Sequence, residues 1–79
     1  MPRYFFHIHD GTEFPDNDGT ELPDLEAARH EAVRLAGHVI THIGPKFWDE
    51  HHKATWRLEI ADNDGTTLAR LRFSGEQLN

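Results

Sequence analysis

The chain of 79 residues contains no cysteine, which excludes a disulfide framework and a thiolate metal site. It has no run of basic residues, and its 8 lysines and arginines are outnumbered by 14 aspartates and glutamates, giving a formal net charge of −6. This balance argues against non-specific binding to a nucleic-acid backbone. No stretch approaches the roughly 20 apolar residues of a membrane helix, and the first residues lack a signal peptide's apolar stretch. We therefore expect a cytoplasmic protein without a membrane partner.

Residue patterns typical of catalysis are scarce as well. Ser74 is the only serine, and the sequence contains neither a strained nucleophile turn nor a glycine-rich phosphate loop. Thr41 and His42 are adjacent in a helical segment, so their side chains point in different directions and form no triad. A chain of this length also has little room for a deep pocket. We expect no enzyme activity, no catalytic residue and no cofactor.

The length indicates a single domain over residues 1–79. A domain of this size buries only about 60–65% of the surface that its unfolded chain exposes, so its core is small. Without disulfides, stability has to come from packing, from association or from a metal site made of histidines and carboxylates. Association with a partner is therefore a reasonable expectation.

The tripeptide Asp-Gly-Thr occurs three times. Two of its copies are the ends of the same five-residue sequence, Asp-Asn-Asp-Gly-Thr, which occurs once from Asp16 and once from Asp62. Asp-Gly suits tight turns, whereas spaced Asp and Asn oxygens before a glycine build calcium loops. An EF-hand loop needs oxygen ligands at its first and twelfth positions. Aligning the two copies with this loop puts apolar residues there, namely Phe14 and Leu25 in one register and Ile60 and Leu71 in the other. The repeats therefore predict turns rather than calcium sites.

Alternating apolar residues predict strands over residues 3–9 and 55–62 and over residues 68–73. The last two are joined through Asp62-Asn63-Asp64-Gly65, the strongest hairpin signal in the chain. A short strand is expected over residues 12–14, with an extended piece over residues 20–22 at a sheet edge. Residues 74–79 are expected to form a frayed tail.

A helix is predicted over residues 24–43. Asp24 is a good N-cap, and Glu26 puts a negative charge in the first turn. Gly44-Pro45 then supplies a C-terminal glycine and a residue that cannot continue a helix. Apolar residues recur at steps of three and four, at Leu25, Ala28, Ala32, Leu35, Val39 and Ile43.

Together these elements predict an α+β fold in the order β-(β)-α-β-β. We expect a two-layer sandwich, with a small, mainly antiparallel sheet of three main strands and one short strand, and one helix packed on one face. A right-handed crossover allows the last strand to lie between the first strand and residues 55–62, with antiparallel neighbours as in a split β-α-β unit, and we take this order as the prediction.

The sheet face that the helix leaves uncovered is the main candidate for function. By alternation it carries Phe5, His7, His9, Arg57, Glu59, Leu68, Arg70 and Arg72. This face could be a solvated surface with cross-strand charge pairs, an interface with another copy or another protein, or a contact for nucleotides or nucleic acid. Phe47 and Trp48, in the loop after the predicted helix, could cap the core or contact a partner. The predicted interface comprises Phe5, His7, His9, Arg57, Leu68, Arg70, Arg72, Phe47 and Trp48.

Seven histidines are a high number for this length. His7 and His9 share one strand face, and His38 and His42 are one helical turn apart, so either pair could bind Zn²⁺. The two pairs are expected on opposite sides of the sheet, which argues against a shared four-ligand site. His30, Arg34, His38 and His42 form one stripe along the helix. A solvated helix face, a metal site and a pH response are the three interpretations of this stripe.

Three segments resemble a family of short bacterial proteins of unknown function. They are the opening Met-Pro-Arg-Tyr-Phe-Phe-His-Ile-His-Asp-Gly, residues 18–29, and Trp56-Arg57-Leu58-Glu59 followed by Asp64-Gly65. The chain is also similar, at the level of fold, to HicB-type antitoxins, through Leu25-Glu26-Ala27-Ala28 and the order of sheet and helix. That likeness would imply an oligomer that masks an RNA-cleaving toxin, although this chain has no appended DNA-binding segment and its loop before the helix differs.

The sequence thus predicts a non-enzymatic module for protein interaction or self-assembly, whose partner is itself or another protein. Binding of nucleic acid or a nucleotide through the Arg/His/Phe face is the first alternative. Zinc binding through histidines is the second.

Overall fold

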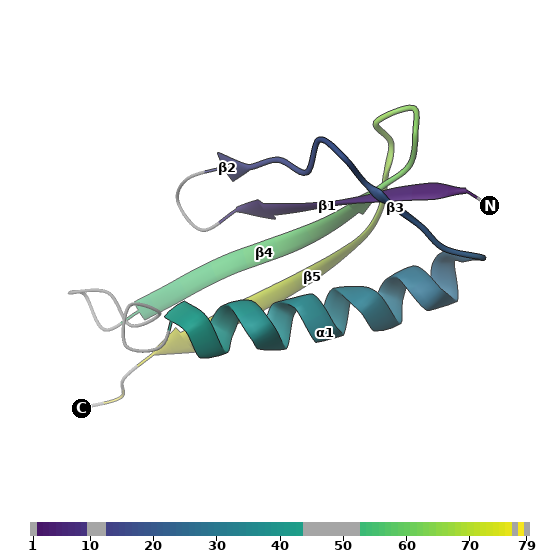
Figure 1. The fold of residues 1–79 in the computed structure, drawn as a ribbon. Helices are drawn as coiled ribbons and strands as arrows, with labels where there is room; N and C mark the ends of the chain where they lie inside the picture. The colour runs from purple at the N-terminus through teal and green to yellow at the C-terminus, as the bar shows by residue number, and fades with distance from the viewer. Residues whose placement is uncertain (1, 10–12, 44–52, 77, 79) are drawn as a thin grey trace.

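A computed structural model describes residues 2–9, 13–43, 53–76 and 78. One helix lies along one face of an antiparallel sheet (Figure 1). In chain order the elements are β1 (Arg3–His9), β2 (Glu13–Phe14), β3 (Thr20–Glu21), α1 (Leu25–Ile43), β4 (Lys53–Ala61) and β5 (Thr67–Glu76). The predicted α+β class and order of elements are confirmed, and both short extended pieces before the helix are strands.

The spatial order of the strands is β2-β1-β4-β5, with β3 also paired to β1. The prediction that the last strand lies beside the first was wrong, because β4 occupies that place and pairs antiparallel with β1. The reason is the return segment between β1 and α1. It brings the chain back to the start of β1, where the Leu22 N–H donates to the Pro2 carbonyl at 3.1 Å. Helix α1 therefore runs in the same direction as β1, and β4 runs against both (Figure 1).

Asp24 caps α1 as predicted. Its Oδ1 accepts a hydrogen bond from the Ala27 N–H at 2.9 Å, and its carbonyl accepts one from the Ala28 N–H at 3.1 Å. Glu26 in the first turn complements the helix dipole. Within the described part of the chain, no helix has the length and apolar character needed to cross a membrane.

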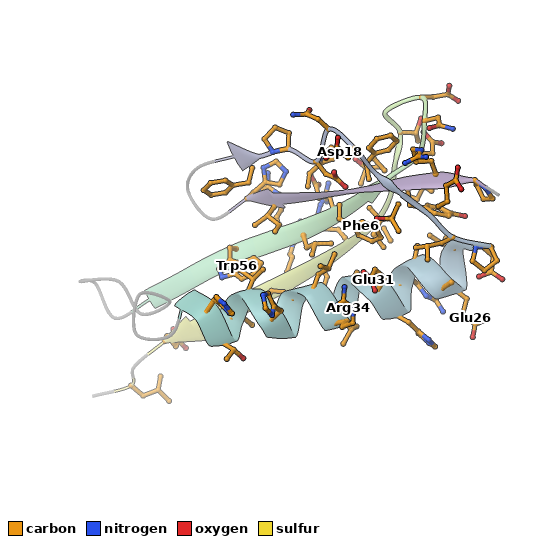
Figure 2. The ribbon with its side chains drawn as sticks, in the orientation of Figure 1. Phe6, Asp18, Glu26, Glu31, Arg34 and Trp56 are labelled. Carbon is orange, nitrogen blue, oxygen red and sulfur yellow. The ribbon has the colours of Figure 1, made fainter. Side chains whose placement is uncertain are left out.

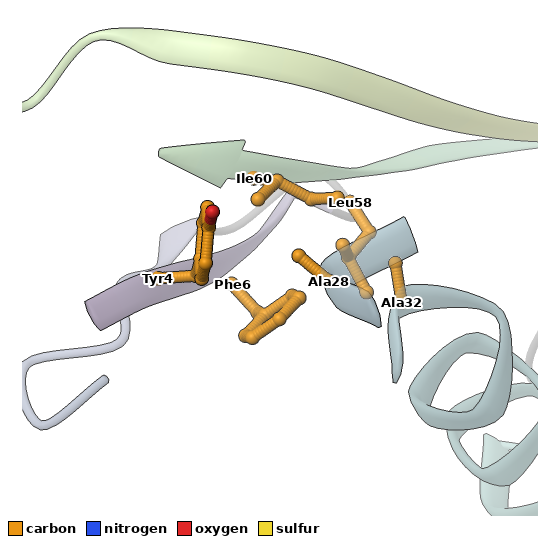
Figure 3. Close-up of a cluster of buried hydrophobic side chains, with 6 residues drawn as sticks. All are labelled: Tyr4, Phe6, Ala28, Ala32, Leu58 and Ile60. Carbon is orange, nitrogen blue, oxygen red and sulfur yellow. The ribbon is translucent and has the colours of Figure 1, made fainter. Parts of the chain in front are cut away.

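The core lies between α1 and the sheet face made by β1 and β4. Tyr4, Phe6, Leu58 and Ile60 pack against Ala28 and Ala32 (Figure 3). Small alanine side chains let the helix backbone approach the large side chains of the sheet. At the other end of β4, the rings of Trp56 and Phe73 lie 4.9 Å apart. The alternation predicted for the covered face is confirmed.

Strand β5 is longer than predicted. Its ladder with β4 continues through Ser74, Gly75 and Glu76, which pair with residues 55, 54 and 53. The expectation of a tail starting at Ser74 is therefore corrected for residues 74–76. Sequence alternation ends at Phe73, but β4 begins early enough to give the next three residues backbone partners.

The two long repeats form turns, as predicted. Asp62 Oδ1 accepts hydrogen bonds from the Asp64 N–H at 2.9 Å and the Thr66 N–H at 3.0 Å. Asp16 Oδ1 likewise accepts two backbone bonds, from the N–H groups of residues 18 and 19 at 3.1 and 3.0 Å. The glycines have positive φ angles, 74° at Gly19 and 81° at Gly65. No group of three or more potential metal ligands occurs among the described residues, and residues 10–12 lie outside them.

The first repeat also attaches its loop to β1. Asp16 Oδ2 accepts a hydrogen bond from the Phe6 N–H at 3.2 Å, and the Asp16 N–H donates to His7 Nδ1 at 3.0 Å. Burial opposes ionisation of this carboxylate, but three backbone N–H donors and the nearby His7 hold the pKa of Asp16 below its usual value. The Asp16 side chain thus accepts the hydrogen bond of the Phe6 N–H, which lies on the edge of β1 between the residues that pair with β2 and those that pair with β3.

Candidate interaction face

The sheet face turned away from α1 gathers polar side chains from three strands. Because side chains alternate along a strand, the residues between the core positions of β1, β4 and β5 project to this side. The register brings His7 beside Glu59 and His9 beside Arg57. We define the open face as Phe5, His7, His9, Arg57, Glu59, Arg70 and Arg72. The structure thus brings these predicted residues together, and their role as an interface stays a prediction.

Glu59 is the acceptor at the centre of the open face. Its Oε1 lies 2.9 Å from His9 Nε2, and its Oε2 accepts a bond from Arg70 Nε at 2.5 Å. Arg57 Nε is 3.8 Å from the same oxygen. The hydrogen bond from Arg70 lowers the pKa of Glu59, assisted by the charges of its neighbours and opposed by burial. Because this one carboxylate is already engaged by its neighbours, it has little capacity left for another cation.

Arg57 and Arg72 lie directly opposite each other on β4 and β5. Like charges in this position repel. The Arg57 side chain is 46% exposed, and Arg72 has no ion pair among the described residues. The open face therefore has an excess of positive charge, although the whole chain is acidic.

Phe5 is not an open stacking platform. Its ring lies beside that of His7, with ring centroids 6.5 Å apart. The loop of the first repeat also covers it, since a Cβ added to Gly19 would lie 2.8 Å from Phe5 Cε2. The nitrogen of His7 nearest this loop already accepts the bond from Asp16. Phe5 and His7 thus already make contacts within the protein, which leaves less of their rings available to a ligand.

Leu68 departs from the regular register. Ile60 pairs with Ala69 and Ala61 pairs with Thr67, so Leu68 is the extra residue of a bulge in β5. Simple alternation therefore does not fix its side chain on the open face, and no sequence signal marked the bulge. Phe47 and Trp48, the other predicted interface residues, lie outside the described residues.

The histidine pairs lie on different layers, as predicted. His38 and His42 are on the exposed side of α1, with ring centroids 4.2 Å apart, whereas His7 and His9 belong to the open face. Glu31 and Arg34 lie next to each other on α1 (Figure 2) and share two hydrogen bonds of 2.8 and 2.6 Å. Zinc binding by either histidine pair stays a prediction.

An apolar groove, which sequence reasoning missed, runs between α1 and β5. Its volume is about 230 Å³, and it is lined by Arg29, Ala32, Val33, Ile60, Ala69, Arg70 and Leu71. Val33 is 62% exposed at its rim. The groove depends on where the helix sits across the sheet, which no periodicity encodes.

Replacing Glu59 by glutamine should lower the free energy of unfolding by about 1 kcal/mol at pH 7, because its charged hydrogen bonds are lost. The pKa of Glu59 is lowered in the folded protein from a usual value of 4.5. Its stabilising effect is therefore present above pH 4.5 and is lost as the pH falls through the folded-state pKa. Urea unfolding of both proteins between pH 7 and pH 3 measures this difference.

Asp64→Asn is the matched control, since it removes an exposed carboxylate that has no ion pair among the described residues. A difference between wild type and Glu59→Gln that stays constant down to pH 3 would contradict the role of the Glu59 charge.

The model of a family described as "Domain of unknown function (DUF6894)" matches residues 3–74. No curated protein and no solved structure matches the chain. The matched segment includes α1 and every strand up to the last residues of β5.

Proposed function

Because the chain belongs to the DUF6894 family, whose description assigns no activity, we propose a function from its surface chemistry. It is a non-enzymatic interaction module that binds an acidic segment of another protein through the open face. The observation that carries this proposal is the pair Arg57 and Arg72, which face each other with an excess of positive charge. The family resemblance seen in the sequence is confirmed, whereas the likeness to HicB-type antitoxins and the bacterial origin stay predictions.

Carboxylates suit this site for a geometric reason. An arginine side chain presents a planar fork of N–H donors that matches the two oxygens of a carboxylate. A carboxylate placed between Arg57 and Arg72 would remove their mutual repulsion and gain hydrogen bonds from both. Glu59 is engaged by His9 and Arg70 and cannot fill this role fully.

A protein carboxylate is favoured over nucleic acid by two observations. Single-stranded nucleic acids are usually held by exposed aromatic rings that stack on bases, but Phe5 is partly covered by the loop of the first repeat. The formal net charge of −6 also repels a polyanion at long range. An acidic segment of a protein carries charge only at its acidic side chains, so it experiences less of this repulsion than a long nucleic acid with one charge per nucleotide.

A fluorescent hexaglutamate peptide is the probe for this proposal. We expect binding at low ionic strength that weakens as salt is added, measured by fluorescence anisotropy. Arg72→Ala should weaken binding about fivefold, equivalent to the loss of about 1 kcal/mol from one charged hydrogen bond.

Arg34→Ala is the matched control, because it removes the same charge from α1, where Arg34 is paired with Glu31. Equal loss of binding in the two variants would show attraction by net charge alone and would contradict the open face as the site. Tighter binding of a hexathymidine oligonucleotide than of the peptide would favour the nucleic-acid alternative.

A further inference from the structure

The outer edge of β5 is the clearest unused pairing surface of the described sheet. β5 ends the strand order β2-β1-β4-β5 and pairs only with β4 among the described strands. Its ten residues contain no proline, and the bulge at Leu68 is confined to its beginning. Such an edge presents a row of backbone N–H and C=O groups that can pair with another strand.

The surface next to this edge is apolar. The groove between α1 and β5 opens beside it, with Val33 on the helix and Leu71 on the strand. Phe73, which packs on Trp56, is only partly buried on the same side. A strand added to this edge would cover apolar surface and would also form hydrogen bonds with the backbone N–H and C=O groups of β5.

We propose that a second copy of this chain pairs its β5 antiparallel with this β5, centred on Phe73. The charges of β5 favour this register. A centre at Leu71 would set Arg70 opposite Arg72 of the second copy, and a centre at Arg72 would set that arginine opposite itself, and like charges directly opposite repel. A centre at Phe73 instead sets Arg70 opposite Glu76 of the second copy, twice by symmetry.

The Phe73-centred register has two further advantages. It sets Arg72 opposite Ser74 of the second copy, and it brings the two Phe73 side chains together beside the Trp56–Phe73 ring contact. A centre at Ser74 would also set an arginine, Arg72, opposite Glu76, but it pairs only residues 72–76 of the strand instead of residues 70–76 and leaves Arg70 without a partner within it.

The occupant is a second copy because β5 is complementary to itself in this register. The pairing keeps each side chain on its own face of the sheet, since opposed residues are both even or both odd in number. It would join the two open faces into one larger surface with both helices on the other side. The dimer does not depend on the acidic partner proposed above.

Sedimentation equilibrium at micromolar concentration tests the dimer. We expect the wild type to be dimeric and Glu76→Arg to raise the dissociation constant about tenfold or more, because two attractive pairs become repulsive. Asp64→Arg makes the same charge change in the exposed hairpin turn and should leave the dimer intact. Circular dichroism checks that both variants are folded.

Cysteine cross-linking tests the register, and the chain has no cysteine of its own to interfere. Opposed residues of antiparallel strands have Cα atoms about 4.5–5.5 Å apart, within the range that a disulfide spans. Arg72→Cys mixed with Ser74→Cys should therefore form a covalent dimer on mild oxidation. Each variant alone should form much less, because identical positions 72 or 74 are not opposed.

A wild type that is monomeric up to 100 micromolar, on the order of a weak interface's dissociation constant, would overturn the dimer. A dimer unaffected by Glu76→Arg, or one in which the mixed cysteine variants form no covalent product, would overturn the β5 edge and its register. Peptide binding by the open face is measured separately, so either proposal can fail alone.

Discussion

Replacing Leu58 by alanine is expected to lower the free energy of unfolding by about 2–5 kcal/mol, enough to unfold much of a small domain. Leu58 is 0% exposed and is the largest side chain in the structure buried to this degree among the described residues. It lies on the central strand, between Ile8 on β1 and Leu71 on β5. Its removal would leave a cavity at the point where the helix and three strands meet.

Urea unfolding followed by circular dichroism measures this loss. Leu78→Ala is the control, because Leu78 is 85% exposed and its truncation should change stability by less than about 0.5 kcal/mol. Similar effects in the two variants would show that Leu58 does not occupy the centre of the core.

The second large effect is expected at Gly19. Both Gly19 and Gly65 have positive φ angles, 74° and 81°, so alanine should cost about 1 kcal/mol at either position from backbone strain alone. At Gly19 the added Cβ would also lie 2.7 Å from Arg3 Cγ and 2.8 Å from Phe5 Cε2. At Gly65 it would meet nothing within 4 Å. We expect a total cost of about 2–4 kcal/mol for Gly19→Ala, because overpacking adds to the strain.

Thermal and urea unfolding of Gly19→Ala and Gly65→Ala measure the two costs side by side. The identical repeats make this a matched comparison, since the wild-type sequence around both glycines is Asp-Asn-Asp-Gly-Thr. Equal losses would indicate that the loop of the first repeat does not rest on Arg3 and Phe5. A larger loss at Gly65 would contradict the open space around that turn.

Local signals predicted most of the elements. The cap at Asp24 and the three-to-four spacing of apolar residues defined α1 to within one residue. Alternation defined β1 and the covered face of the sheet, because a single residue's shift would move every apolar side chain to the wrong side. The turn at Gly65 followed from the residue types that positive φ requires.

The candidate site was predicted only as a set of residues on one face. Alternation could place Arg57, Glu59 and Arg70 together, but not the distances that make Glu59 the shared acceptor. The partner of Arg57 across the ladder depends on the register between β4 and β5, and the bulge at Leu68 alters that register. The groove beside α1 depends on the lateral position of the helix, which residue spacing leaves undetermined.

Sequence alone determined where this chain is helical, where it is extended and which side chains face the core, because each depends on periodicity and on capping or turn residues. Tertiary structure decided that β4 rather than β5 lies beside β1, because the return segment held by Asp16 and Leu22 reverses the chain before the helix begins. That reversal leaves β5 at an edge of the sheet, whereas the hairpin register and the bulge at Leu68 set Arg72 opposite Arg57. The proposed dimer edge follows from this long-range arrangement, which local residue patterns do not encode.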